Sequence, residues 1–452
     1  MTKLEIIQVK IKDLKEYPNN PKIHTDKQIK QIIKSIQKFG FNDPIAIDAD
    51  NQIIEGHGRV LAAKELGMET VPAIRLPHLT EKQKKAYIIA HNKLTMNTGF
   101  NPDRLYKEIK TLLFDPDLII GFEDMELADL QELSVNEILE DKDPDETPPL
   151  PDDEEIIIKH GDIMELGRHK LICGDSTFPG TFKDLMGNEK ARMVFTDPPY
   201  GVSYTGVNNP NGRNWGGIKN DDLRGDDLYL FLLDAFKNVF DYTIENPALY
   251  VFYASATHIQ FEEALKAAGF KVKQQLIWDK GMVLCHSDYH WTHEPILYCS
   301  KKKNCEWFGN RRQKTLWKQL DIDDLELMEK EELIEILREL KEGSTVWKIK
   351  KDFALTYIHP TQKPVELAVK AIINSSKIGD IILEPFAGSG STIIGCEITN
   401  RKCRAVEYDP KFCQLIVDRW CKYTGGDNIK INNKEVNWED YKTEIVEHKK
   451  RK

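Results

Sequence analysis

Short apolar runs alternate with amphipathic stretches over the first 140 residues, and this pattern predicts a small domain of mixed strands and helices. The expected strands lie at residues 5–11, 45–47, 52–54 and 71–76, and the expected helices at 26–38, 60–66, 80–95 and 101–113. The isoleucines of residues 26–38 share one helical face, with Asp26 as the expected N-cap and Gly40 as the expected stop.

The rest of the chain alternates more regularly, and its strands are almost wholly apolar. Apolar runs occur at residues 170–173, 191–195, 248–254, 274–278, 295–299, 380–384 and 403–407, and amphipathic stretches at 227–240, 257–268, 364–374, 390–398 and 411–422. Apolar strands separated by helices predict an α/β fold, with a doubly wound, mostly parallel sheet covered on both faces. Because such sheets bind ligands at the carboxyl ends of their strands, the loops after these runs are the expected site.

A stretch without apolar character separates the two patterns. Residues 141–155, DKDPDETPPLPDDEE, hold eight acids and four prolines. This favours an extended linker, because like charges repel and proline removes backbone donors. We therefore expect an N-terminal domain at 1–140, the linker at 141–155, a larger domain at 156–430 with an insert at 202–350, and a C-terminal tail at 431–452.

Composition narrows the functional classes. The 452 residues are 40% hydrophobic and 30% charged, with a net charge of −10, which argues against a simple basic protein that coats nucleic acid. No apolar run reaches the ~20 residues of a membrane span. The N-terminus lacks the apolar stretch of a signal peptide, and the eight cysteines form no CxxC pair. We expect a cytoplasmic protein with reduced thiols.

The first candidate site is TDPPYG, residues 196–201, which directly follows an apolar run. Pro198 and Pro199 stiffen the backbone and remove two N–H donors. The loop then offers the Asp197 carboxylate, unpaired carbonyls and the Tyr200 ring, which are acceptors beside a stacking surface. This suits a planar group with an exocyclic amine, such as adenine N6 or cytosine N4. The structural alternative is a proline turn with a capping Asp.

The second candidate is ILEPFAGSGST, residues 382–392, where glycines lie between an apolar run and a helical pattern. Gly388 and Gly390 allow a backbone to approach a ligand closely. No GK[ST] follows, so this is not a Walker loop, and the acidic Glu384 better fits a ligand with a positive amine. Glu407 ends the next apolar run, where an acid usually accepts from ribose hydroxyls. The structural alternatives are a tight strand–helix turn and a surface carboxylate.

Five motifs in order give the C-terminal part a resemblance to a known family. CGDS, TDPPYG, HPTQKPVEL, EPFAGSGST and CRAVEYDP span most of residues 156–425. They resemble the β class of S-adenosylmethionine-dependent DNA amino-methyltransferases, in which the catalytic motif precedes the cofactor loop. The resemblance implies a site-specific DNA methyltransferase, of the kind found in restriction–modification systems. DPPY is the usual adenine-N6 form in that family, so a flipped adenine is the expected target and cytosine N4 the alternative.

The resemblance also implies a role for each matching residue. Asp197 and the carbonyl of Pro198, beside Pro199, hold the target amine, and the base stacks on Tyr200. The residues implied in binding S-adenosylmethionine are Asp175, Thr361, Lys363, Glu384, Phe386, Gly388, Gly390 and Glu407. Neither a covalent enzyme intermediate nor a metal is implied, because the methyl group of this donor is already electrophilic.

Contacts to double-stranded DNA are expected between the two loops. Residues 202–220 are rich in Gly and Asn and could close over a flipped base. Residues 299–318 hold seven Lys or Arg and one Glu, which favours phosphate contacts, with a solvated edge as the alternative. The residues expected to contact DNA are Arg213, Trp215, Lys301, Lys302, Lys303, Arg311 and Arg312.

Two further segments allow alternative interpretations. His286, His290 and His293 invite a zinc hypothesis, but their spacing is not that of a zinc site, so no metal is expected. Residues 321–342 form an acidic helical pattern. It is interpreted either as a helix packed on the domain or as the contact of a homodimer.

The N-terminal domain resembles the ParB N-terminal domain, through YPNNPKIHTDKQIKQIIKSIQKFGFNDPIAID and IIEGHGRVLAAKELGMETVPAI. GHGR, with His57 and Arg59, replaces the GERR-type signature of partition proteins, so an accessory role such as DNA docking is expected rather than nucleotide hydrolysis. Fusion of the two domains is similar to proteins of phages and mobile elements. Two other classes of function stay open: a partition-like DNA-binding protein with an inactive methyltransferase part, and a methyltransferase of RNA or protein.

Overall fold

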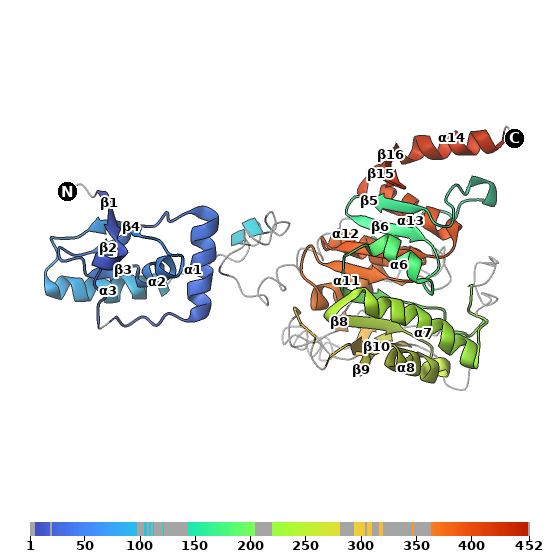
Figure 1. Cartoon of the computed structure of the whole chain (residues 1–452), viewed down its shortest axis with the longest axis horizontal. Coiled ribbons are helices and arrows are strands. Elements are labelled where there is room, and N and C mark those ends of the chain that lie inside the picture. The colour runs from blue at the N-terminus through green and yellow to red at the C-terminus, as the bar shows by residue number, and fades with distance from the viewer. Residues whose placement is uncertain are drawn as a thin grey trace, which may run out of the picture. The chain divides into compact units, whose positions relative to one another are not determined.

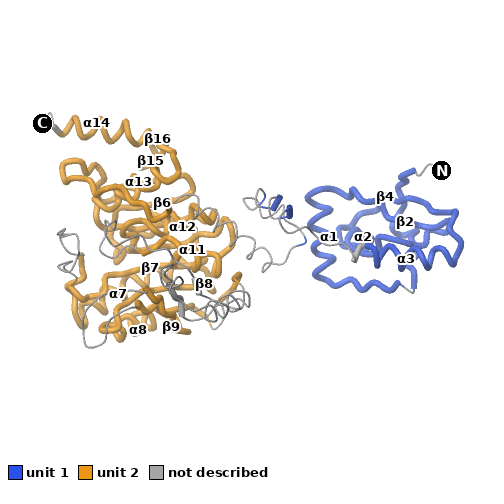
Figure 2. The backbone as a smooth tube through the Cα atoms, turned by 180° about the vertical axis from the view of Figure 1, so that it is seen from behind, with its two compact units in different colours: residues 1–130 blue, residues 131–452 orange. Residues whose placement is uncertain are grey.

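Figure 1 shows the computed structural model of the chain. It describes residues 5–18, 20–96, 143–203, 219–280, 293–302, 305–309, 316–319, 346–347 and 363–450, with isolated residues at 104, 105, 108, 109, 112 and 121. The chain divides into two compact units, unit 1 at residues 1–130 and unit 2 at residues 131–452 (Figure 2).

Unit 1 is a four-stranded sheet with helices packed against it, in the order β1-β4-β2-β3, with β2 parallel to β4. Its core contains Ile45, Ile47, Val60 and Val71. The elements are β1 (Ile6–Lys10), a 3₁₀ helix (Ile11–Asp13), α1 (Asp26–Phe39), β2 (Ile45–Ile47), β3 (Ile53–Glu55), α2 (His57–Glu65), β4 (Thr70–Arg75) and α3 (Glu81–Met96).

The elements expected in unit 1 are confirmed, with one correction at the start of α1. The hydroxyl of Thr25 accepts from the backbone N–H of Gln28 (3.2 Å), so Thr25 is the N-cap and Asp26 is the first helical residue. Gly40 ends the helix, as predicted. The helix expected at 101–113 lies mostly outside the described residues.

Unit 2 contains a sheet that has twelve strands in the described residues, in the order β12-β11-β9-β10-β8-β7-β13-β14-β6-β5-β15-β16. The strands are β5 (Ile163–Leu166), β6 (His169–Cys173), β7 (Ala191–Thr196), β8 (Thr243–Phe252), β9 (Lys271–Asp279), β10 (His293–Ser300), β11 (Leu316–Gln319), β12 (Val346–Trp347), β13 (Ile381–Glu384), β14 (Lys402–Glu407), β15 (Asn428–Ile431) and β16 (Lys434–Asn437). The helices are 3₁₀ turns (Asp153–Glu155 and Ser255–Thr257), α6 (Pro179–Met186), α7 (Gly225–Asp241), α8 (His258–Ala267), α11 (Val365–Ser375), α12 (Ser391–Ile398), α13 (Pro410–Thr424) and α14 (Trp438–Lys450).

The centre of this sheet is parallel and both of its faces are buried. Strands β8, β7, β13, β14 and β6 run parallel, while β10 and β5 flank them antiparallel. Along β7, Met193 packs on the face of α11, α12 and α13, and Val194 packs on the face of α6, α7 and α8. Ile382 and Leu383 alternate in the same way on β13. The predicted doubly wound α/β fold is confirmed, with mixed rather than parallel edges.

The C-terminal segment expected as a tail at 431–452 is folded. Asn432 and Asn433, with φ values of 50° and 66°, form a two-residue turn between β15 and β16, because Asn tolerates the left-handed region that such hairpin turns need. The hairpin pairs with β5, and Trp438 at the start of α14 is fully buried. Apolar burial therefore extends the larger domain beyond residue 430.

The acidic stretch expected as a linker lies against unit 2 over its described part. The Asp145 carboxylate accepts from the backbone N–H of Val365 (2.8 Å) and so caps α11. The Pro144 carbonyl accepts from the buried guanidinium of Arg419 (2.9 Å), and Glu146 pairs with Lys422 (2.8 Å). The acids find donors on α11 and α13, so residues 143–155 are not a free spacer.

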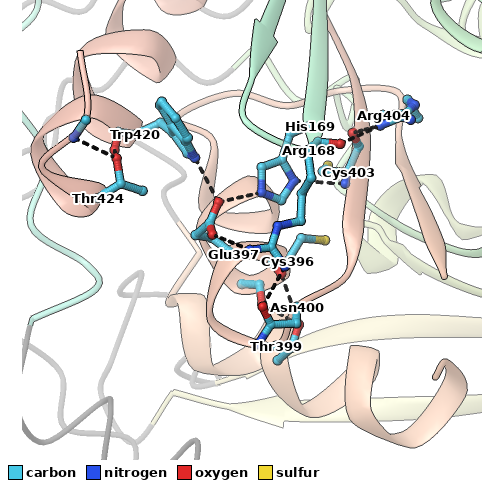
Figure 3. Close-up of polar contacts among 12 residues, drawn as sticks. Arg168, His169, Cys396, Glu397, Thr399, Asn400, Cys403, Arg404, Trp420 and Thr424 are labelled. Atoms are coloured by element: carbon cyan, nitrogen blue, oxygen red, sulfur yellow. Dashed lines mark hydrogen bonds and ion pairs between the residues drawn. The ribbon is translucent and has the colours of Figure 1, made fainter. Parts of the chain in front are cut away.

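A polar cluster joins the first residues of β6 and β14 to α12 and α13 (Figure 3). Glu397 accepts from Nε2 of His169 (2.8 Å) and from Nε1 of Trp420 (3.0 Å). Nδ1 of His169 accepts from the backbone N–H of Cys403 (3.0 Å), so the ring carries its proton on Nε2 and is neutral. Burial lowers the pKa of His169. Burial opposes ionisation of Glu397, but its hydrogen bonds with His169 and Trp420 lower its pKa to about 2.

In the part of the chain that the structure describes, none of the helices has both the length and the apolar character needed to cross a membrane.

Candidate active site

Four neighbouring parallel strands end at one edge of the unit 2 sheet, and each brings an acid there. From β7, β13, β14 and β6, these acids are Asp197, Glu384, Glu407 and Asp175. The backbone N–H of Gly388 donates to Oε2 of Glu407 (2.8 Å), and Val194 of β7 lies opposite Leu383 of β13. The loops at 197 and 388 therefore lie at the same edge, as the sequence predicted.

The Asp197 carboxylate has a donor on each oxygen. The hydroxyl of Tyr200 donates to Oδ1 (2.5 Å), and Nζ of Lys363 lies 2.8 Å from Oδ2. Burial raises the pKa of Asp197, although Lys363 counteracts this in part, and burial raises the pKa of Tyr200 well above its ordinary value. The sequence placed Lys363 with the cofactor. The structure places its ammonium on the catalytic loop, while its carbonyl accepts from Ser391 at the start of α12 (2.7 Å).

Two charged residues that the sequence analysis did not assign to the catalytic loop complete this arrangement. Oε2 of Glu294, at the start of β10, lies 2.9 Å from Nζ of Lys363 and 3.4 Å from the Tyr200 hydroxyl. Lys280, directly after β9, pairs with the other oxygen of Glu294. Burial would raise the pKa of Glu294, but the two ammonium groups lower it to about 2. Asp197, Tyr200, Lys280, Glu294 and Lys363 are named the Lys363 cluster below.

Aromatic rings surround the Lys363 ammonium and fix the Tyr200 ring. Nζ lies 4.9 Å from the ring centroid of Phe252, 5.6 Å from that of Tyr200 and 6.0 Å from that of Trp278. The Tyr200 ring also packs edge-on against Phe261, with centroids 6.3 Å apart. Tyr200 is held at its hydroxyl and at its ring, which suits a surface on which a planar ligand stacks.

The glycine loop is built around a buried acid. Glu384 accepts from the backbone N–H of Phe386 (3.0 Å) and from the hydroxyl of Thr392 (2.9 Å), and burial raises its pKa to about 8. Gly390 is the left-handed N-cap of α12 (φ 84°), and a Cβ there would lie 3.0 Å from the side chain of Ile416. Gly388 has φ 53°, and a Cβ there would meet open space. The loop therefore exposes its backbone at Gly388.

The acids of β14 and β6 are held by backbone and hydroxyl groups. Glu407 accepts from the N–H groups of Gly388 (2.8 Å) and Asp409 (2.9 Å), and burial raises its pKa to about 7. Asp175 accepts from the N–H and the hydroxyl of Thr177, both at 2.8 Å. Each carboxylate oxygen has two lone pairs, so both acids keep capacity for a ligand's hydroxyl or amine.

Arg419, which the sequence analysis also missed, holds the glycine loop through a hydrogen bond to Ser389. Its guanidinium is buried and donates to the carbonyl of Ser389 (2.9 Å) and to that of Pro144 (2.9 Å). The sequence does carry a signal for this residue, because Arg419 lies in the apolar stretch of α13. A charged residue is seldom buried in such a stretch unless it has buried partners. The segment before residue 156 thus supports the loop that carries Gly388.

Two of the basic residues expected to contact DNA, Lys301 and Lys302, are described, and both have partners within the protein. Nζ of Lys301 donates to the carbonyls of Phe240 (2.5 Å) and Thr243 (2.8 Å) at the end of α7, and burial lowers its pKa to about 8. Lys301 therefore caps the end of α7 in this structure, and its contact with phosphate stays a prediction. The exposed Lys302 pairs with Glu245. Outside the described residues lie Thr361, Arg213, Trp215, Lys303, Arg311, Arg312, His286, His290 and the pattern at 321–342.

The GHGR segment of unit 1 begins α2. Gly56 is its left-handed N-cap (φ 93°), and Arg59 pairs with Glu55 (2.9 Å) and with Asp43. Two carboxylates thus neutralise the arginine that the sequence offered for a phosphate. Among the described residues of both units, no group of three or more His, Cys, Asp or Glu side chains is placed so that it could hold a metal ion.

Comparison with known proteins finds a different family for each of the two units. Residues 1–92 match the profile of the ParB N-terminal domain, and residues 191–418 match that of the DNA methylases. The chain is 42% identical over 83 residues to the ParB-like nuclease domain-containing protein YnaK of Escherichia coli strain K12, covering 18% of this chain and 95% of that protein. It is 25% identical over 249 residues to the type II methyltransferase M2.DpnII of Streptococcus pneumoniae (52% of this chain, 85% of that protein). It is also 25% identical over 240 residues to the DNA adenine methyltransferase YhdJ of Escherichia coli strain K12 (50% and 75%). With half of its length matched, and with its acceptor and glycine loops at one sheet edge, the chain belongs to the DNA methylase family.

Proposed function

We propose that this DNA methylase transfers a methyl group from S-adenosylmethionine to the N6 amine of an adenine flipped out of DNA. The observation that carries the proposal is the adjacency of the two loops, because Asp197 and Gly388 follow paired parallel strands, β7 and β13. An acceptor for an amine and an exposed backbone for a donor molecule therefore lie at one edge, as a direct transfer requires.

The residues of the glycine loop and its neighbours fit a donor with an amine, a ribose and a purine. Glu384, which precedes the loop and accepts from the N–H of Phe386, is assigned to the amine, and Glu407 keeps lone pairs for ribose hydroxyls. Asp175 ends the neighbouring strand and is assigned to the purine. The open space at Gly388, with Gly390 and Phe386 beside it, is assigned to the methionine part. S-adenosylmethionine, when bound, supplies an electrophilic methyl group.

The catalytic loop is assigned to hold and orient the target amine. Asp197 accepts one N–H of the amine and the carbonyl of Pro198 accepts the other, which turns the nitrogen lone pair away from both acceptors. Pro198 and Pro199 offer no N–H that would compete for them. The Tyr200 ring stacks on the extruded base and offsets part of the few kcal/mol that unstacking costs.

Adenine is proposed as the target because of the DPPY form and the similarity to a DNA adenine methyltransferase. Double-stranded DNA is the proposed substrate, and unit 1 has an accessory role such as docking to it. Lys302 is exposed and is assigned to DNA. Arg213, Trp215, Lys303, Arg311 and Arg312 are assigned to DNA from the sequence.

The test uses tritiated S-adenosylmethionine and duplex DNA with the full chain. The wild type should incorporate label into DNA, and Asp197→Ala should abolish incorporation while its affinity for S-adenosylmethionine, measured by calorimetry, stays close to wild type. Asp184→Ala, on the exposed face of α6, is the matched control and should retain full activity. Incorporation by Asp197→Ala at the wild-type rate would refute the assignment. A wild type that shifts DNA on gels without methylating it would favour a binding protein.

A further inference from the structure

The proposed chemistry assigns no role to Glu294, a largely buried carboxylate of the Lys363 cluster. Asp197 receives hydrogen bonds from Tyr200 (2.5 Å) and Lys363 (2.8 Å). Each oxygen keeps a second lone pair, so an entering amine has to share the carboxylate with these donors or displace one of them. The ammonium is the stronger competitor, because its charge adds to the hydrogen bond.

Lys363 has a second carboxylate at nearly the same distance. Its Nζ lies 2.9 Å from Oε2 of Glu294 and 2.8 Å from Oδ2 of Asp197. Glu294 is held in turn by Lys280, from the end of the neighbouring strand β9. The side chains of Lys363, Lys280 and Glu294 are 7%, 13% and 17% exposed, so water replaces few of these contacts.

We propose that Glu294 is a positioning residue for methyl transfer, which retains the Lys363 ammonium when the target amine takes its place on Asp197. This inference rests on the proposed function of the site. The cluster holds two carboxylates and two ammonium groups, so its formal charge is zero before and after the exchange. Without Glu294, an ammonium that left Asp197 would keep the Tyr200 hydroxyl (3.3 Å) but would have no carboxylate among the described residues of the cluster. A buried charge without a counter-charge is strongly unfavourable.

The test variant is Glu294→Gln, which keeps the shape of the side chain and removes its charge. Lys363 then has Asp197 as its one remaining carboxylate in the cluster. We expect kcat/KM for DNA to fall by about 10- to 100-fold, the range that follows from a misplaced catalytic group. The affinity for S-adenosylmethionine should stay within about 3-fold of wild type, a change worth well under 1.4 kcal/mol.

A second variant separates positioning from charge balance. Glu294→Gln leaves two ammonium groups with one carboxylate, whereas Glu294→Gln/Lys280→Met leaves one of each. If Glu294 positions Lys363, the double variant regains wild-type stability but stays as slow in methyl transfer as the single variant. Glu189→Gln is the matched control, because it removes an acid paired with Arg404 (2.7 Å) near the start of β7, and it should be fully active.

The outcomes are distinct. Wild-type kcat/KM in Glu294→Gln would overturn the inference, and so would recovery of kcat/KM in the double variant, since Glu294 would then serve charge balance alone. If Glu294→Gln fails to fold, the charge-balanced double variant decides the question by the same criterion. Absence of methyl transfer in the wild type would refute the proposed function itself, which is distinguishable from a loss confined to the Glu294 variants.

Discussion

The glycine loop offers a quantitative test, because three left-handed glycines of unit 2 differ in what a Cβ would meet. Gly388 (φ 53°) and Gly425 (φ 72°), the C-cap of α13, both face open space. At Gly390 (φ 84°), a Cβ would lie 3.0 and 3.1 Å from two carbons of Ile416, a buried core side chain. Substitution by alanine at each position therefore separates backbone strain, crowding and ligand contact.

The expected magnitudes follow from these environments. A left-handed alanine costs about 1–2 kcal/mol, and the stiffer unfolded chain returns about 0.4–1 kcal/mol of this. Gly425→Ala and Gly388→Ala should each lose about 1 kcal/mol of stability. Gly390→Ala should lose about 2–4 kcal/mol, because the packed core cannot absorb the added methyl group without about 1–3 kcal/mol of overpacking.

The assay pairs unfolding with ligand affinity. All eight tryptophans lie after residue 130, so tryptophan fluorescence in a urea titration reports the unfolding of unit 2 alone. Calorimetry with S-adenosylmethionine should show that Gly388→Ala weakens binding at least about tenfold, which is about 1.4 kcal/mol. Gly425→Ala, with the same strain, should bind as the wild type does. Equal affinity of Gly388→Ala and Gly425→Ala would refute the assignment of the open space at Gly388 to the donor.

Three further predictions concern residues away from the reacting groups. The pKa of His169 is lowered from 6.5 in the folded state, so its stabilising contribution is complete above pH 6.5 and is lost below it, by at most about 1.4 kcal/mol per pH unit. His169→Gln should flatten that slope in urea titrations at pH 5 to 7, and an unchanged slope would contradict the neutral ring. Asp145→Ala should cost about 1–2 kcal/mol, because α11 loses its cap. The same titrations test this, and an unchanged midpoint would mean that residues 143–155 are a free spacer. Lys301→Ala should lower stability and leave DNA affinity unchanged, whereas a reduced salt dependence of DNA binding by about one charge would restore Lys301 as a phosphate contact.

Much of the central sheet could be predicted from the sequence, because its strands are continuous apolar runs and its site lies where parallel strands end. The same rule predicts from the sequence that Asp197 and Gly388 lie at one edge. Glu294 could not be placed this way, since β10 runs antiparallel to β8 and brings its first residues, rather than its last, to that edge. Strand direction depends on long-range pairing, which a local pattern does not reveal.

The remaining differences arise from partners that are distant in sequence. Lys363 was assigned to the cofactor through its motif, but its ammonium lies on carboxylates at positions 197 and 294. The charge and proline content of residues 141–155 predicted a linker, whereas the Pro144 carbonyl accepts from the buried Arg419, more than 260 residues later. The hairpin after residue 430 did have a local signal, the Asn432–Asn433 turn between alternating residues, which was overlooked.

The most direct test of the central claim is mass spectrometry of nucleosides from duplex DNA incubated with the full chain and S-adenosylmethionine. The arrangement of Asp197 beside the glycine loop predicts that 6-methyladenine accumulates with the wild type and is absent with Asp197→Ala. Accumulation of 4-methylcytosine in its place would contradict the choice of adenine. The absence of any methylated nucleoside would contradict methyl transfer at this site.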